Sequence, residues 1–189
     1  MTRSLPTLTL VLAACAVGAP AVAQSVDGPQ TSQATFQGLA PGACIMGAPL
    51  APSTDNAEVG ALSPGSADVT ITELVDEDGE IQSATIILQL PAVCNQAHTL
   101  GLGSLNGGLL SDGPAPTSDA FRSLAPYQVT VDWSGVQQVF DTQTGALVLP
   151  VDGAATGDVS LTIQIPPGGA PLTAGVYSDQ LVIELGVAG

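Results

Sequence analysis

The sequence has 189 residues, with 17 aspartates and glutamates against two lysines and arginines, and a formal net charge of −15 at pH 7. An acidic surface of this kind repels phosphate backbones and anionic lipid headgroups. We therefore expect no binding to nucleic acid or to a membrane surface, and the charge itself helps to keep the protein soluble.

Residues 1–23 predict a secretory signal peptide. One positive charge, Arg3, precedes an apolar run over residues 5–17, and small residues end the segment at Ala23. Export signals share this layout, and neither this run nor any later one reaches the roughly 20 apolar residues of a membrane span, so we expect no membrane insertion. As an alternative, the residues that end at Cys15 resemble a bacterial lipoprotein box with Cys15 as the lipidated residue. Either processing sends the mature chain to the periplasm, the cell surface or the extracellular space.

The mature chain is expected to have two parts. Residues 24–43 are polar and offer little to bury beyond Phe36 and Leu39, which predicts a mobile N-terminal extension. Residues 44–189 have the length of one domain with its own core.

Two cysteines remain in the mature chain, Cys44 and Cys94. In an exported protein such a pair predicts one disulfide. It would close a loop of about 50 residues and stabilise the fold by about 4 kcal/mol. His98 is the one histidine, and two sulfurs with a single histidine do not complete a zinc site. We expect no metal and no cofactor.

Alternating apolar and polar side chains predict short strands joined by glycine and proline turns. Prolines divide residues 44–65, so any strand there is expected to be short or at a sheet edge. No segment has apolar residues at helical spacing over three turns. Seven or eight short strands without helices predict an all-β fold, an immunoglobulin-like β-sandwich. The expected strands cover residues 69–74, 81–90, 98–105, 127–133, 136–140, 146–151 and 159–165, and a last one begins at residue 181.

The last expected strand decides most of the functional interpretation. Its apolar side chains fall on every second residue, at Leu181, Ile183, Leu185 and Val187, which predicts one buried face. The printed sequence then offers no later strand to pair with its far side. Either an earlier part of the chain pairs with this strand, or a piece of another molecule completes the sheet.

Several of these features together resemble the spore coat protein U domain family, which includes pilins of the archaic chaperone–usher pili of Gram-negative bacteria. They are the two cysteines, the run His98–Leu109, Tyr127 with Trp133, the turn at residues 166–169, and the ending with Gly175, Tyr177 and Asp179 before an alternating strand. The resemblance covers roughly residues 44–187.

The resemblance implies a pilin-like sandwich that lacks its last strand and has a disulfide between its first two strands. It also implies partners: a periplasmic chaperone that lends a strand during export, an usher, and neighbouring subunits. In the fibre, the N-terminal extension of the next subunit replaces the chaperone's strand. On this basis Leu181, Ile183, Leu185, Val187, Phe36 and Leu39 are the expected residues of the subunit interface.

Catalytic and metal chemistry have weaker support in the sequence. Asp76, Asp78 and Glu80 would match only the opening of a calcium loop, so a solvated hairpin turn is the preferred interpretation. His98 lacks a recognisable nucleophile motif and is interpreted as a strand-end histidine. Trp133 and Tyr127 share one face of a strand and are expected to anchor the core. We expect no enzymatic activity.

Two hypotheses follow for the function. The first is a structural subunit of a bacterial surface fibre that assembles by donor-strand exchange. The alternative is a self-contained secreted or surface-attached sandwich that acts as an adhesive or matrix-binding protein. The ligand and the fibre type have no signature in the sequence.

Overall fold

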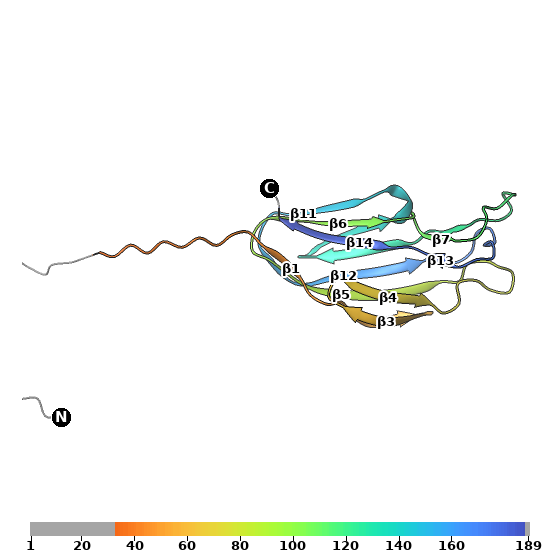
Figure 1. Cartoon of the computed structure of the whole chain (residues 1–189), viewed down its shortest axis with the longest axis horizontal. Coiled ribbons are helices and arrows are strands. Elements are labelled where there is room, and N and C mark those ends of the chain that lie inside the picture. The colour runs from red at the N-terminus through yellow and green to blue at the C-terminus, as the bar shows by residue number, and fades with distance from the viewer. Residues whose placement is uncertain (1–32, 188–189) are drawn as a thin grey trace, which may run out of the picture. The chain divides into compact units, whose positions relative to one another are not determined.

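The computed structural model describes residues 33–187 and has an all-β fold (Figure 1). The chain divides into two units, residues 1–39 and 40–189. Residues 33–39 form no strand, and the sandwich belongs to the second unit. The predicted signal peptide, the alternative lipidation of Cys15 and the first part of the extension lie outside the described residues.

Fourteen strands and one short 3₁₀ helix make up the described part of the chain. Their bounds are β1 Cys44–Met46, β2 Leu50–Asp55, β3 Ala57–Ser63, β4 Ser66–Ile71, β5 Ala84–Cys94, β6 His98–Ser104, β7 Leu109–Ser111, β8 Leu124–Ala125, β9 Gln128–Trp133, β10 Val136–Asp141, η1 Thr142–Thr144, β11 Leu147–Val151, β12 Ala155–Ile165, β13 Tyr177–Ser178 and β14 Leu181–Val187.

Two antiparallel sheets carry the sandwich. The larger has the order β1-β5-β12-β9-β10, with β2 also paired to β5, and the smaller has the order β11-β6-β14. In the usual lettering of immunoglobulin strands, β1 with β2 corresponds to A, β5 to B, β6 to C, β9 to D, β12 to E and β14 to F. Strands A-B-E-D then lie in the larger sheet, and C and F lie in the smaller one. This is the strand order of an immunoglobulin sandwich, in which a strand G would follow beside F. Among residues 33–187 no strand takes that place beside β14.

The core lies between the two sheets and follows the predicted alternation. Along β5 every second residue from Ala84 to Cys94 is buried, and the intervening residues are half-buried or exposed. The paired strand β12 places Val159 opposite Leu90 and Leu161 opposite Leu88, so adjacent strands bury facing side chains. Trp133 is among the largest fully buried side chains, as its expected core role requires.

A tyrosine fixes the connection between β12 and β14. The Tyr177 hydroxyl donates a hydrogen bond of 2.7 Å to the backbone carbonyl of Thr173, four residues upstream. Such a corner occurs in immunoglobulin-like sandwiches at the turn that leads into strand F. It supports the assignment of β14 to that position.

Two smaller sheets extend the sandwich. The sheet β13-β7-β8 lies at one end (Figure 1), and β3 and β4 form a two-stranded ribbon. At the base of the ribbon, the side-chain amide of Asn56 donates to the carbonyls of Glu73 and Ser83 and accepts from the amide of Glu73. Asn56 therefore ties the ribbon to the segment that precedes β5.

The predicted all-β fold is confirmed, but the number and bounds of the strands differ from the prediction. Seven or eight strands were expected. Of the additional ones, β1, β7, β8 and β13 have two or three residues each, whereas β2 and β3 have six and seven. Strand β5 begins at Ala84 and runs through Pro91, where a strand end was expected. Pro91 is tolerated because β5 changes its partner there from β2 to β1, so no ladder bond needs its missing N–H on that side. None of the described residues forms a helix with the length and apolar character that crossing a membrane would take.

Candidate functional site

Strand β14 has one free edge. It pairs with β6 from Leu181 opposite Ser104 to Val187 opposite His98, and no described residue pairs with its other side. Its inward side chains Leu181, Ile183 and Leu185 are only half-buried, although the inward leucines of β6 are at most 2% exposed. The missing neighbour therefore leaves apolar surface uncovered.

A second strand edge faces β14. Strand β4 pairs with β3 alone, and its inward side chains Ala67, Val69 and Ile71 are half-buried while the intervening residues are exposed. Residues of β4 and of β14 line the same hollow. Two strand edges without partners among residues 33–187 thus form its walls.

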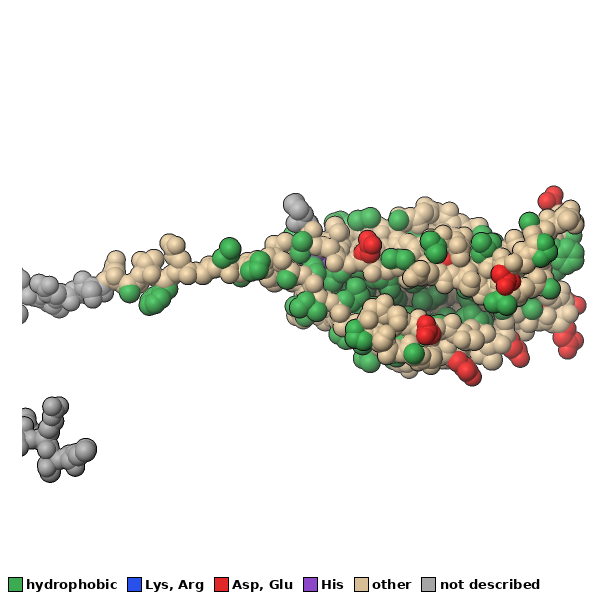
Figure 2. Space-filling model, viewed as in Figure 1, with side chains coloured by type: hydrophobic (Ala, Val, Ile, Leu, Met, Phe, Trp, Pro, Cys, Tyr) green, Lys and Arg blue, Asp and Glu red, His purple; other side chains and the backbone are tan. Residues whose placement is uncertain are grey.

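We call this hollow, between β4 and β14, the edge groove. Its floor consists of inward side chains of β5 (Ile86, Leu88 and Leu90) and β12 (Ile163 and Ile165). Figure 2 shows hydrophobic side chains inside a cleft on this face of the molecule. The volume of the groove is about 510 Å³, which is more than enough for several apolar side chains of an extended segment.

The expected interface residues of β14 are placed differently along this groove. Leu181 and Ile183 line it. Leu185 and Val187 lie beyond it, toward the end where β14 runs close to β1, and Val187 is 44% exposed. Phe36 and Leu39 belong to the first unit and are 93% and 94% exposed.

One end of the edge groove is polar. The Asp179 carboxylate accepts hydrogen bonds from the hydroxyls of Tyr127 (2.7 Å) and Ser104 (2.5 Å) and from the backbone amide of Asn106 (2.9 Å). Burial raises the pKa of the Tyr127 phenol, and the hydrogen bond and negative charge of Asp179 raise it further. Asp179 thereby anchors the segment that leads into β14. The sequence motif contains this residue, but its partners lie 52 to 75 residues away and have no local signature.

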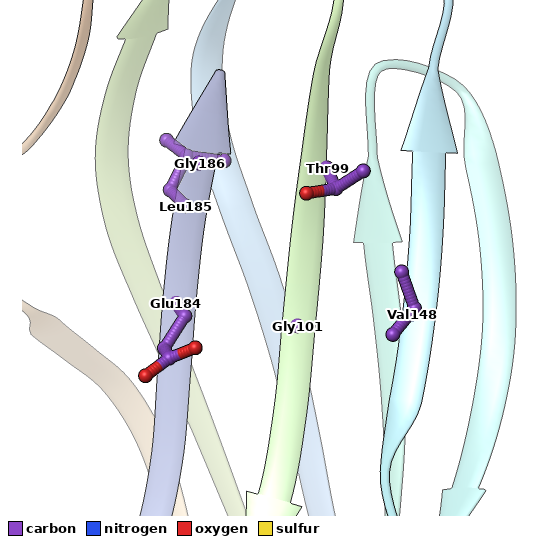
Figure 3. A pocket seen from close by; sticks show the side chains of 6 residues that line it. All are labelled: Thr99, Gly101, Val148, Glu184, Leu185 and Gly186. Carbon is purple, nitrogen blue, oxygen red and sulfur yellow. The ribbon is translucent and has the colours of Figure 1, made fainter. Parts of the chain in front are cut away.

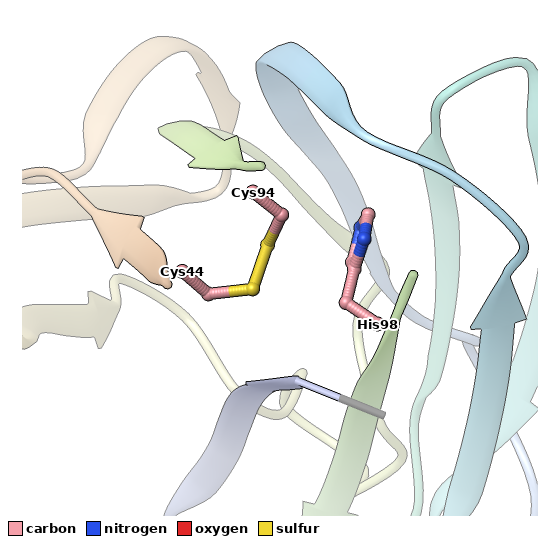
Figure 4. Close-up of side chains that lie close together, drawn as sticks. All are labelled: Cys44, Cys94 and His98. Atoms are coloured by element: carbon pink, nitrogen blue, oxygen red, sulfur yellow. A yellow bond between two sulfur atoms is a disulfide. The ribbon is translucent and has the colours of Figure 1, made fainter. Parts of the chain in front are cut away.

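The predicted disulfide between Cys44 and Cys94 is confirmed (Figure 4). The sulfur–sulfur distance is 2.05 Å, and the two residues lie directly opposite each other in the β1–β5 pair. The bond ties the first strand of the sandwich to the strand that forms the groove floor. It is compatible with an oxidising export compartment.

His98 lies beside this disulfide, a proximity that its sequence separation from Cys44 concealed. Its ligand atom and the two sulfurs lie within 4.8 Å of one another. Both sulfurs are committed to the disulfide, and the ring nitrogens of His98 contact the Gln96 carbonyl (2.9 Å) and the Trp133 indole N–H (2.8 Å). In this oxidised state neither sulfur is a thiolate and both ring nitrogens of His98 are hydrogen-bonded, so the three residues do not present a metal-ligand set.

A second depression lies on the outer face of the smaller sheet (Figure 3). It has a volume of about 480 Å³ and arises where Gly101 of β6 and Gly186 of β14 carry no side chain. Val148 and the exposed Glu184 flank it. Its polar side chains are the Thr99 hydroxyl and the Glu184 carboxylate, a pair that does not make up the set of convergent groups expected of a catalytic site.

The acidic segment at residues 76–80 forms a turn. One oxygen of the Asp76 carboxylate accepts hydrogen bonds from the backbone amides of Asp78 (3.0 Å) and Glu80 (2.9 Å). A bridge between Val75 and Ile81 closes the segment. Backbone hydrogen bonds from Asp76 to the Glu80 carbonyl and from Gly79 to the Asp76 carbonyl complete the turn, which supports the hairpin-turn interpretation.

No family model matches the chain, and neither does any curated protein or any solved structure. Among the described residues, the edge groove is the main structural feature that bears on function.

Proposed function

We propose that this protein is a structural subunit of a bacterial surface fibre, and that subunits join when an extended segment of one copy enters the edge groove of another. The observation that carries the proposal is the free edge of β14 above an apolar floor. An added strand satisfies unpaired backbone groups and at the same time covers apolar side chains. Each large aliphatic side chain that becomes fully buried contributes about 1.5–3 kcal/mol.

The segment that best fits the groove is residues 33–40 of a second copy. Between Asp27 and Asp55 the sequence has no charged residue, so this stretch can approach an acidic domain without repulsion. In an extended conformation, Ala34 and Phe36 share one face while Gln33, Thr35 and Gln37 share the other. An apolar face toward the groove and a polar face toward water is the pattern that an added edge strand needs.

Phe36 is the anchor in this arrangement. Phe36 and Leu39 are three residues apart, so a regular strand points them to opposite faces. The face with Phe36 also carries Ala34 and Gly38, so Phe36 is the one large side chain that this face brings to the groove. We assign Phe36 to the groove and Leu39 to the outer face of the added strand.

The same free edge needs protection before assembly. An uncovered strand edge beside apolar surface invites aggregation. A periplasmic chaperone that lends a strand, and an usher that exchanges it for the next subunit, would supply this protection, as the family resemblance implies. Export of the chain, indicated by residues 1–23, and the disulfide are consistent with assembly outside the cytoplasm.

The proposal is tested by two matched substitutions in the extension. The full-length Phe36→Asp and Leu39→Asp proteins are exported together with a chaperone and usher, and filaments are counted by electron microscopy. We expect Phe36→Asp to abolish filaments and Leu39→Asp to leave them. If Phe36→Asp forms filaments as the wild type does, residues 33–40 do not occupy the groove. If no variant forms filaments, including the wild type, the alternative of a self-contained exported sandwich is favoured.

A further inference from the structure

We propose that Asn95 is a positioning residue that decides which copy's edge groove the extension can enter. By holding residues 41–43 straight, it prevents the extension from folding back into the groove of its own chain and leaves a second copy as the partner. This inference rests on the proposed function and adds to it a residue that selects the partner.

Asn95 binds the chain at the root of the extension through three hydrogen bonds. Its backbone N–H donates to the Ala43 carbonyl at 3.1 Å. Its side-chain oxygen accepts from the Ala43 amide at 2.8 Å, and its side-chain N–H donates to the Pro41 carbonyl at 2.8 Å. The carbonyl of one residue and the amide of the second residue after it point to the same side in an extended chain. One side-chain amide can therefore serve both groups only while residues 41–43 remain extended.

The disulfide at Cys44, the next residue along the chain, holds the same segment in place. Cys44 is joined to Cys94, the residue before Asn95, by the disulfide and by strand pairing. Pro41 and Ala43 are thus bonded to Asn95, and Cys44 is bonded to Cys94. The direction of residues 41–44 on the sandwich is set by these bonds.

Residues 41–44 run away from the end of β1 that borders the chain's own edge groove. The groove adjoins β1 at its other end, since Met46 and Gly47 line it while Cys44 does not. To reach it, the extension would have to reverse direction just before Cys44. Pro41 followed by Gly42 is a sequence that favours such a reversal, with proline and glycine at the two central positions of a type II turn.

A turn at Pro41 and Gly42 would place residues 33–40 beside the edge of β1 that has no partner among residues 33–187 and that lies near β14. The bonds of Asn95 oppose this turn. A reversal further upstream, at Gly38 to Ala40, would consume residues of the strand and leave Phe36 next to the turn. The sequence at Pro41 and Gly42 thus favours a turn, but the hydrogen bonds of Asn95 hold these residues extended.

The test measures whether the groove is free in a folded monomer. A fluorescent peptide with the sequence of residues 24–43 is titrated into the mature protein, which keeps its own extension. The protein is refolded at low concentration with its disulfide intact. The variants are Asn95→Ala, Asn95→Asp and, as the control at an exposed position outside the groove, Val148→Ala. Circular dichroism and the fluorescence of Trp133 verify that each variant is folded.

We expect the wild type and Val148→Ala to bind the peptide equally well. A tethered segment that can reach the groove competes at an effective concentration on the order of millimolar. Asn95→Ala should therefore bind the peptide at least about tenfold more weakly, because its own extension occupies the groove. Asn95→Asp should behave similarly, since a carboxylate cannot donate to the Pro41 carbonyl.

The double variant Asn95→Ala with Phe36→Asp distinguishes occupation of the groove from damage to it. Its extension cannot dock, so we expect peptide binding to return to the wild-type affinity. If both folded Asn95 variants bind the peptide as the wild type does, the role of Asn95 is refuted while the proposed function stands. Weakened binding that the Phe36→Asp change does not restore would also refute it. If the wild type itself does not bind the peptide, the proposed function fails and the role of Asn95 with it.

Discussion

The indole N–H of Trp133 donates a hydrogen bond of 2.8 Å to Nε2 of His98, and both side chains are only 1% exposed. Because Nε2 is the acceptor, the proton of the neutral imidazole is on Nδ1, which donates to the carbonyl of Gln96. This pair joins the first residue of β6 to the last residue of β9, in opposite sheets of the sandwich. It gives the one histidine a structural position beside the disulfide.

Replacement of His98 should therefore affect stability. His98→Ala leaves the buried Trp133 N–H without its partner, which costs about 1–3 kcal/mol, and opens a cavity that adds to the loss. We expect the free energy of unfolding, measured in urea, to fall by about 2–4 kcal/mol. A double-mutant cycle with Trp133→Phe should show coupling between the two residues. Folded His98→Ala protein should bind the peptide of residues 24–43 within a few-fold of the wild type. A loss of two orders of magnitude or more would contradict the structural role.

The disulfide can be tested by mass and by stability. The unreduced mature protein should be two hydrogens lighter than its dithiol form, with peptides containing Cys44 and Cys94 linked. The bond spans a sequence separation of 50 residues, and the chain-entropy relation gives about 4 kcal/mol for such a loop. The Cys44→Ser, Cys94→Ser double variant should lose about that much in urea denaturation. Two free thiols that react with an alkylating agent in the native protein would contradict the bond.

The phenol of Tyr127 predicts a loss of stability at alkaline pH. Its pKa is raised in the folded protein, chiefly by burial and further by Asp179, from an ordinary value of 10.0. Above about pH 10 the unfolded chain releases this proton while the folded chain retains it, so the free energy of unfolding falls as pH rises there and is unaffected below. Tyr127→Phe should be less stable at neutral pH, by about 1–3 kcal/mol for the lost hydrogen bond. Above about pH 10 the stability of the variant should decline less steeply than that of the wild type. An equal slope in both proteins, followed by Trp133 fluorescence, would show that Tyr127 does not contribute.

The strands that the sequence predicts well are those whose alternation is strict. The pattern from Val159 to Ile165 and the pattern from Leu181 to Val187 both correspond to strands, because burial on one face imposes a period of two. The ribbon of β3 and β4 was only partly foreseen, since glycine and proline interrupt its sequence and its register shifts between Val59 and Leu62. A local pattern shows which face of a strand is buried but not which strand lies beside it.

The candidate site shows the same limit. Leu181 and Ile183 were identified from their alternation, but the opposite wall of the edge groove, including Val69 and Ile71, was not. Polar anchors were missed for a related reason. Asn95 and Pro41 are separated by 54 residues, and no neighbouring residue in the sequence indicates their hydrogen bond.

The edge groove itself can be tested with a charge in its wall. Ile183 is half-buried and lines the groove, so an aspartate there would have to be dehydrated when a strand enters. The matched control is Val148→Asp, in the same sheet at an outward position that is 62% exposed and does not line the groove. We expect Ile183→Asp to weaken binding of the peptide of residues 24–43 at least about hundredfold, which corresponds to roughly 2.7 kcal/mol, and Val148→Asp to leave it unchanged. Isothermal titration calorimetry gives both affinities. If Ile183→Asp remains folded and binds as tightly as Val148→Asp, the peptide does not enter between β4 and β14, and the free edge of β14 must be covered in another way.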